Sequence, residues 1–187
     1  MIHKTRKELE VGSGNVFLYY GYTSVLLAII IYLITYLTAH PAWNFLWFAM
    51  FLPQIIIHFK NRKNKPHAVT YTDKMLGNTW KIVGWLMVLT CITILGMGCF
   101  THAINFSLML PLALLYVCTG TMISGLVVNI PSITRLTVVA TIIPVMILIE
   151  MRSGQAFHTN WNLMAAIAFL LALIVPGHIL NHKAVKG

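Results

Sequence analysis

The chain has 187 residues, of which 58% are hydrophobic and only 9% are charged. About a quarter of the residues of an ordinary soluble domain are charged, so this composition excludes a soluble globular protein and predicts a chain that lies largely in lipid. The net charge of +9 would suggest nucleic-acid binding if it covered a soluble surface, but the sequence offers no soluble domain. We therefore predict a single membrane domain over residues 1–187.

Six apolar stretches are long enough, or nearly long enough, to cross a bilayer as helices, which takes about 20 residues. They are continuous, whereas the strands of a membrane β-barrel alternate apolar and polar positions. The predicted fold class is therefore all-α, an integral membrane bundle of six transmembrane helices. In chain order the predicted helices cover about 16–37, 43–59, 72–100, 106–128, 133–149 and 161–180.

A basic segment, KNRKNKPHAVTYTDK, joins the second and third predicted helices, and residues 60–71 form the predicted cytoplasmic loop. If both termini lie in the cytoplasm, all but one of the 13 Lys and Arg residues fall on the cytoplasmic side, and Arg152 alone falls on the other. Short, positively charged loops stay in the cytoplasm. This asymmetry predicts six helices with both termini cytoplasmic and explains the basic loop as a topology signal.

The same loop can contact anionic lipid headgroups, because each basic residue near an anionic leaflet gains about 1 kcal/mol. We favour the topology signal over a specific lipid site. Nucleic acid is not expected as a partner, since the loop is short and belongs to no recognisable binding module. A protein partner on the cytoplasmic face and an oligomeric state stay open. The candidate headgroup contacts are Lys60, Arg62, Lys63 and Lys65.

Similar phrases open the even-numbered predicted helices: HPAWNFLW, HAINFSLM and HTNWNLMA. Their asparagines, Asn44, Asn105 and Asn162, are one helical hairpin apart, so the chain could consist of three tandem hairpins. Asn is also a favoured N-cap residue, and Trp and His are common at membrane interfaces. We favour this capping explanation and keep the repeat as an alternative.

Aromatic residues gather near both predicted membrane surfaces, where such belts are typical. We interpret them as boundary markers. The outward histidines of the three phrases lack the tight spacing or the carboxylate partners of a metal site, so neither a metal nor a cofactor is expected. The belt residues are Tyr19, Tyr20, Tyr22, Trp80 and Trp85 near the inner surface and Trp43, Trp47 and Trp161 near the outer one.

Catalytic chemistry is not expected. No ionisable residue lies near the centre of a predicted helix, which argues against a proton-coupled pump. The H-E-x-x-H and G-x-S-x-G motifs are missing, and paired aspartates are excluded because Asp73 is the only Asp in the chain. We predict no catalytic residues and a protein that is not an enzyme.

Prolines occur in four of the predicted helices. A proline kinks a spanning helix and frees a carbonyl that a neighbouring helix or a ligand can use. Structural adjustment is the favoured explanation, and a ligand cavity is the functional alternative. The candidate cavity residues are Gln54, which is the most polar group at depth, and Pro53, Pro111, Pro144 and Pro176.

Small residues in the segment TGTMISG of the fourth predicted helix lie four apart. Such spacing allows another helix to approach closely. We slightly favour a contact inside the bundle over one between copies of the chain. The candidate helix-packing residues are Gly120, Ser124 and Gly125.

Two segments, GNVFLYYGYTSVLLAIIIYLITYLTAHPAWNFLWF at 14–48 and TYTDKMLGNTWKIVG at 70–84, resemble uncharacterised small multi-pass proteins of bacterial inner membranes. The resemblance implies a location in the bacterial cytoplasmic (inner) membrane and transfers no site residue. The function expected is passive binding or transport of a neutral or lipid-like ligand in a helical bundle. The alternative is a non-catalytic regulatory or assembly subunit that acts through its cytoplasmic basic face.

Overall fold

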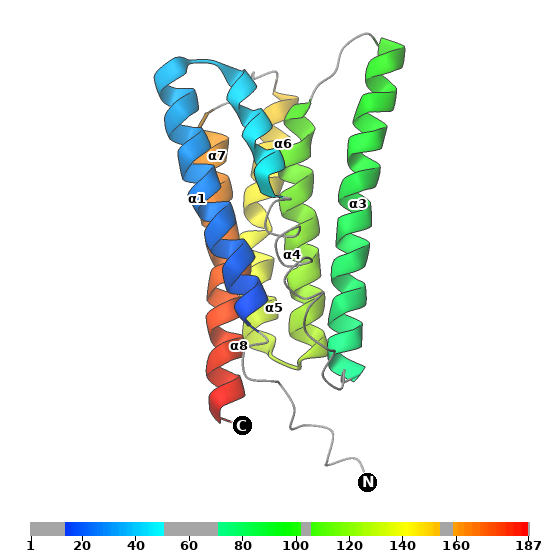
Figure 1. Cartoon of the computed structure of the whole chain (residues 1–187), viewed down its shortest axis with the longest axis vertical. Coiled ribbons are helices and arrows are strands. Elements are labelled where there is room, and N and C mark those ends of the chain that lie inside the picture. The colour runs from blue at the N-terminus through cyan, green and yellow to red at the C-terminus, as the bar shows by residue number, and fades with distance from the viewer. Residues whose placement is uncertain (1–13, 51–70, 102–105, 154–158, 187) are drawn as a thin grey trace, which may run out of the picture.

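The computed structural model describes residues 14–50, 71–101, 106–153 and 159–186. This part of the chain contains helices and no strands, which confirms the all-α prediction. The helices run lengthwise through one elongated bundle (Figure 1). In chain order they are α1 (Asn15–Thr38), the 3₁₀ helix η1 (Pro41–Met50), α3 (Tyr71–Thr101), the short η2 (Phe106–Leu108), α4 (Met109–Val127), α5 (Pro131–Ala140), α6 (Ile142–Arg152), α7 (Asn160–Phe169), the π-helical η3 (Leu170–Ile174) and α8 (Val175–Lys186).

Five of the described helical segments are long and apolar enough to cross a membrane. They match five of the predicted spans to within a few residues. The second predicted span, 43–59, enters the described part only through η1, and residues 51–70 lie outside it, so the count of six stays a prediction. The five segments are Asn15–Thr38, Lys74–Phe100, Phe106–Val127, Pro131–Arg152 and Asn160–Ala184.

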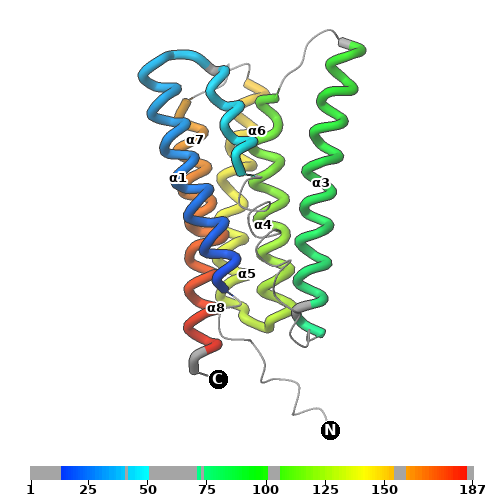
Figure 2. Tube along the Cα trace, in the orientation of Figure 1, coloured from blue at the N-terminus to red at the C-terminus, as the bar shows by residue number. Residues whose placement is uncertain are grey.

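Along the bundle, α1, α3 and the α5–α6 span run in one direction, and η1, α4 and the last span run in the opposite direction (Figure 1). We name the end where α1 begins and α8 ends the terminal end, and the end where α1 stops and α7 begins the distal end. The chain reverses tightly between α1 and η1 at the distal end (Figure 2), where Ala39 adopts a left-handed φ of 52°. Asn129, with φ of 58°, makes the turn between α4 and α5 at the terminal end. Asn accepts this conformation more readily than most residues.

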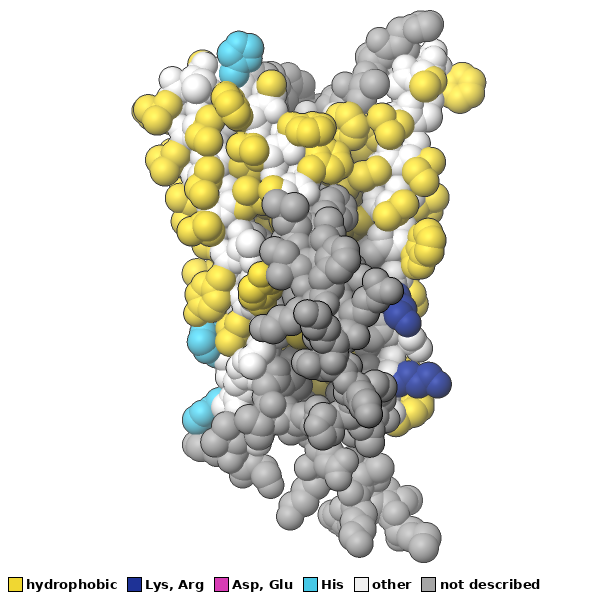
Figure 3. All heavy atoms as spheres, viewed as in Figure 1, with side chains coloured by type: hydrophobic (Ala, Val, Ile, Leu, Met, Phe, Trp, Pro, Cys, Tyr) yellow, Lys and Arg dark blue, Asp and Glu magenta, His cyan; other side chains and the backbone are white. Residues whose placement is uncertain are grey.

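On the face shown in Figure 3, apolar side chains cover most of the described surface toward the distal end. Leu37, Trp85 and Phe100 are 79%, 73% and 89% exposed. Contiguous apolar surface of this extent is typical of a protein that contacts membrane lipid. Among the described residues every Lys and Arg except Arg152 lies toward the terminal end, in the first turns of α3 and α5 or the last turns of α8.

The prolines of the described helices have different effects. Pro111 lies in the first turn of α4, where its missing N–H removes no helical hydrogen bond, and the helix continues unbroken. Pro144 cannot donate to the carbonyl of Ala140, and the span is interrupted at Thr141 between α5 and α6. Pro176 is the second residue of α8, just after the π-helical turn of η3, where a local change of winding accommodates the lost donor.

Glycines bring α1 close to the last span. A methyl group on Gly21 would lie 2.7 Å from the Ile174 side chain of η3, and one on Gly14 would overlap the carbonyl oxygen of Gly177. The backbone N–H of Gly14 donates to Oδ1 of Asn181 at 3.0 Å. Small residues allow this approach of two helix backbones. We name this contact the glycine seam.

The central helix α4 contacts α3 on one side and α5 on another. A methyl group on Gly120 would lie 2.9 Å from Val83 of α3, and one on Gly125 would lie 2.7 Å from the hydroxyl oxygen of Thr134 on α5. The buried Ser124 hydroxyl donates to the carbonyl of Gly120 at 2.8 Å. The small residues singled out in the sequence therefore lie where α4 meets two neighbours inside the bundle.

Candidate functional site

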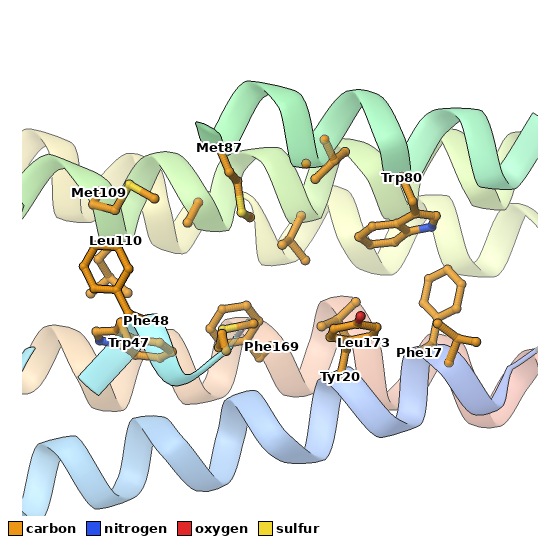
Figure 4. A pocket seen from close by; sticks show the side chains of 16 residues that line it. Phe17, Tyr20, Trp47, Phe48, Trp80, Met87, Met109, Leu110, Phe169 and Leu173 are labelled. Atoms are coloured by element: carbon orange, nitrogen blue, oxygen red, sulfur yellow. The ribbon is translucent and has the colours of Figure 1, made fainter. Parts of the chain in front are cut away.

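A cavity of about 320 Å³ lies between α1, η1, α3 and α4, with the last span along one side (Figure 4). Small-molecule pockets have volumes of about 300–1,000 Å³. Aromatic, aliphatic and methionine side chains make up most of the described lining, which includes no charged residue. The lining residues are Val16, Phe17, Tyr20, Trp47, Phe48, Met50, Trp80, Val83, Gly84, Met87, Met109, Leu110, Ala113, Val117, Phe169 and Leu173.

Aromatic contacts mark both ends of this cavity. Toward the terminal end, the rings of Phe17 on α1 and Trp80 on α3 meet edge to face, with centroids 5.4 Å apart and planes at 86°. Toward the distal end, the Trp47 ring of η1 lies 5.9 Å from that of Phe169 on α7. Such ring pairs are favourable beyond the area they bury. They join the helices through long side chains, so the backbones stay apart and volume remains between them.

The wall formed by α3 and its neighbours is adaptable. Met50, Met87 and Met109 line the cavity from three different helices. Methionine side chains are flexible, fill irregular apolar spaces and make favourable contacts with aromatic rings. Gly84 adds free space, because a methyl group placed on it would have no other heavy atom within 4 Å. The lining can therefore adjust to apolar molecules of different shape.

The 3₁₀ winding of η1 places its hydrogen-bonding residues on the same face as its cavity-lining residues. Residues three apart line up in a 3₁₀ helix, so Asn44, Trp47 and Met50 share one face of η1. Asn162 of α7, which is fully buried, donates from Nδ2 to Oδ1 of Asn44 at 3.0 Å. Its own Oδ1 accepts a bond from Nε1 of Trp47 at 3.0 Å. One buried amide thus fixes the indole ring that lines the distal part of the cavity.

Asn162 is therefore not a helix cap. The helix α7 already begins at Asn160, and the preceding residue, Thr159, makes no side-chain capping bond. The capping interpretation of the phrase HTNWNLMA is wrong, and the asparagines of two of the phrases instead bond to each other. Because Asn105 lies outside the described residues, the tandem-hairpin alternative stays a hypothesis.

Three tryptophans assigned to the aromatic belts have interior positions. Trp47 and Trp80 line the cavity, and Trp161 is only 1% exposed and donates from Nε1 to Oε2 of Glu150 at 2.6 Å. The belt interpretation missed this, because interfacial and buried tryptophans occupy the same places in an apolar run. The available signal was the Trp-Asn pair present in two of the phrases, since an Asn inside an apolar helix needs a hydrogen-bond partner.

The prolines proposed as cavity residues lie elsewhere in the described structure. Pro111, Pro144 and Pro176 are buried between helices, and none of them lines this cavity. The cavity instead lies beside aromatic and methionine side chains. The remaining candidates, which stay predictions because they lie outside the described residues, are Pro53, Gln54 and the headgroup contacts Lys60, Arg62, Lys63 and Lys65.

The described lining offers apolar contact and few polar groups. Its polar side-chain groups belong to Tyr20, Trp47 and Trp80, and it contains no carboxylate, imidazole or thiol. Within the described ranges no three His, Cys, Asp or Glu side chains come together in a way that could hold a metal ion. The arrangement can hold a small apolar molecule and orient it through a very small number of hydrogen bonds.

Comparisons with known proteins do not assign the chain to a family. No protein-family model matches it, and neither a curated protein nor a solved structure shows significant similarity to it.

Proposed function

We propose that the chain is a multi-pass membrane protein that passively binds or carries a neutral, apolar or lipid-like ligand in the cavity between α1, α3 and α4. The observation that carries this proposal is the 320 Å³ cavity with its aromatic and methionine lining. Removing apolar ligand surface from water gains about 25 cal/mol per Å². A charged ligand would lose its hydration and find no opposite charge on the described lining. A neutral apolar ligand is the class that these side chains support.

We also propose that the terminal end faces the cytoplasm and that the membrane is the bacterial inner membrane. The support is the clustering of the described Lys and Arg residues toward that end, with Arg152 as the exception. A single cysteine placed at Lys63, in a variant without the native cysteines, tests the orientation. We expect no reaction with a membrane-impermeant maleimide added to intact spheroplasts, and strong labelling from outside would contradict the proposed topology.

Filling the cavity tests the binding proposal. The phenylalanine in Gly84→Phe would occupy space beside α3 without meeting another heavy atom at its Cβ. In lipid nanodiscs, energy transfer from tryptophan to 9-methylanthracene reports binding because Trp47 and Trp80 line the cavity. We expect wild type to bind this probe above empty nanodiscs and Gly84→Phe to bind it about tenfold more weakly, which corresponds to about 1.4 kcal/mol.

Gly96→Phe is the matched control. Gly96 lies on the same helix and does not line the cavity, and a methyl group placed on it would likewise have no other heavy atom within 4 Å. We expect its affinity for the probe to equal that of wild type. Equal weakening by both variants, or no binding by wild type, would contradict the cavity proposal and favour the alternative of a regulatory or assembly subunit.

A further inference from the structure

Tyr20 brings a hydroxyl group into the largely apolar cavity. Its ring belongs to the lining contributed by α1, and its hydroxyl oxygen lies on the cavity side of that helix (Figure 4). The backbone carbonyl of Tyr20 accepts a bond from the Ser24 hydroxyl at 2.6 Å. The Tyr20 hydroxyl itself makes no hydrogen bond with any other group in the described parts of the chain. Among the described residues it is therefore a donor and acceptor without a partner, and it lies beside the cavity.

The other polar groups of the described lining are less suited to contact a ligand. The N–H of Trp47 is already bonded to Asn162. The indole nitrogen of Trp80 lies on the side of its ring away from the middle of the cavity, toward Phe17 (Figure 4). Tyr20 is consequently the polar group of this lining that a ligand in the middle of the cavity can reach.

From this placement we infer that Tyr20 determines specificity, by selecting ligands that carry one hydroxyl or carbonyl group on an apolar skeleton. The inference rests on the proposed function. A phenol hydroxyl both donates and accepts hydrogen bonds. In apolar surroundings an unmade hydrogen bond is unfavourable, so a ligand that supplies the partner gains over a pure hydrocarbon of the same shape. The apolar remainder of the ligand lies along Met87 and Phe169 toward Trp47.

Charged lipids are a poor match for this site. A carboxylate or phosphate headgroup would be desolvated beside a single phenol and no cation of the described lining. The chemical class expected is therefore a neutral amphiphile with a single polar group, such as a long-chain alcohol or ketone. The cavity and the basic groups of the terminal end therefore suit different lipids: the cavity suits neutral amphiphiles, and the basic groups suit anionic headgroups.

A pair of probes that differ only at the polar group tests the role of Tyr20. The full chain in lipid nanodiscs is titrated with 9-anthracenemethanol and with 9-methylanthracene, and the ratio of the two affinities is corrected for uptake by empty nanodiscs. In Tyr20→Phe we expect this ratio to fall about fivefold toward the hydrocarbon, as the loss of one hydrogen bond predicts. The affinity for 9-methylanthracene should stay unchanged. Tyr36→Phe removes a hydroxyl from a side chain on α1 that is 69% exposed, and it should change neither value.

The outcomes separate the two proposals. If both probes bind and Tyr20→Phe leaves the ratio unchanged, the role of Tyr20 is overturned and the cavity proposal stands. An equal loss of both probes in Tyr20→Phe also overturns it, because removing a hydroxyl does not weaken the contact of a hydrocarbon with the ring. If wild type binds neither probe above empty nanodiscs, the cavity proposal fails and the role of Tyr20 fails with it.

Discussion

The two sides of α1 are built in opposite ways. Toward the last span, Gly14 and Gly21 let the backbones approach until a single methyl group would collide. Toward α3, Phe17 and Tyr20 project into the cavity, and the ring of Phe17 reaches Trp80 across it. Small residues thus exclude space between helices, whereas large flat ones preserve it. The sequence of one helix therefore provides both a rigid contact and a binding volume.

Burial and hydrogen bonding follow the same division. In the most apolar part of the last span 56% of the residues are buried, compared with 22% in α3. Buried Asn162 joins α7 to η1 through two side-chain bonds. On the other side, Thr90 of α3 and Tyr116 of α4 share one bond at 2.8 Å. We infer that α1, η1 and the last span form a fixed frame and that α3 is the more adjustable wall.

The glycine seam can be broken most severely at Gly21. In Gly21→Ala the new methyl group meets the Ile174 side chain at 2.7 Å and the Cβ of Leu173 at 3.1 Å, and the Leu173 Cβ cannot move without its backbone. We expect a loss of about 2 kcal/mol of unfolding free energy, as is typical of overpacking. Gly96→Ala, where the methyl group meets nothing within 4 Å, should stay within about 0.5 kcal/mol of wild type. Denaturant titration in mixed micelles measures both, and equal values for the two variants would contradict the seam.

The two side-chain hydrogen bonds that join α7 to η1 can be removed together at Asn162. In Asn162→Ala, Nε1 of Trp47 and Oδ1 of Asn44 lose this partner in a buried site. We expect a loss of about 1–1.5 kcal/mol, because hydrogen bonds inside membrane proteins contribute at most about 1.7 kcal/mol and on average less. Asn78→Ala removes an exposed amide from α3 and is the control, with little expected change. Denaturant titration again measures the unfolding free energy. A loss no larger than that of Asn78→Ala would show that the bonds of Asn162 do not stabilise the bundle.

The weaker anchoring of α3 can be tested at Tyr116. Tyr116→Phe removes the bond to Thr90, whose hydroxyl can still donate to the carbonyl of Leu86 at 2.8 Å. We therefore expect a loss of only about 0.6 kcal/mol. Tyr36→Phe is again the control. A loss above about 2 kcal/mol would show that α3 is held as firmly as the frame, and the comparison between the two sides of α1 would fail.

The spans and several close contacts could be predicted from the sequence for simple reasons. A run of about 20 apolar residues fixes the existence of a spanning helix, whatever its neighbours are. The small residues around Gly120 and Gly125 indicated close packing, because a missing side chain brings backbones together wherever it is buried. Such features depend on local composition alone.

The cavity could not be predicted in this way, because its volume depends on which helix faces meet. Trp47 and Trp161 look like interfacial residues until their partners, Asn162 and Glu150, are placed beside them. The prolines drew attention to kinks, but a kink shows where a helix is weakened and not where space remains. Pro144 interrupts its span and still lies buried away from the cavity.

Photolabelling tests most directly whether an apolar molecule occupies the cavity. The full chain in lipid nanodiscs is irradiated with a long-chain alcohol that carries a diazirine on its tail, and mass spectrometry locates the labelled residues. We predict labels on Met87 and Phe169, and their loss in Gly84→Phe. Labels confined to outward residues such as Trp85 and Phe100, at levels that Gly84→Phe does not change, would contradict the account.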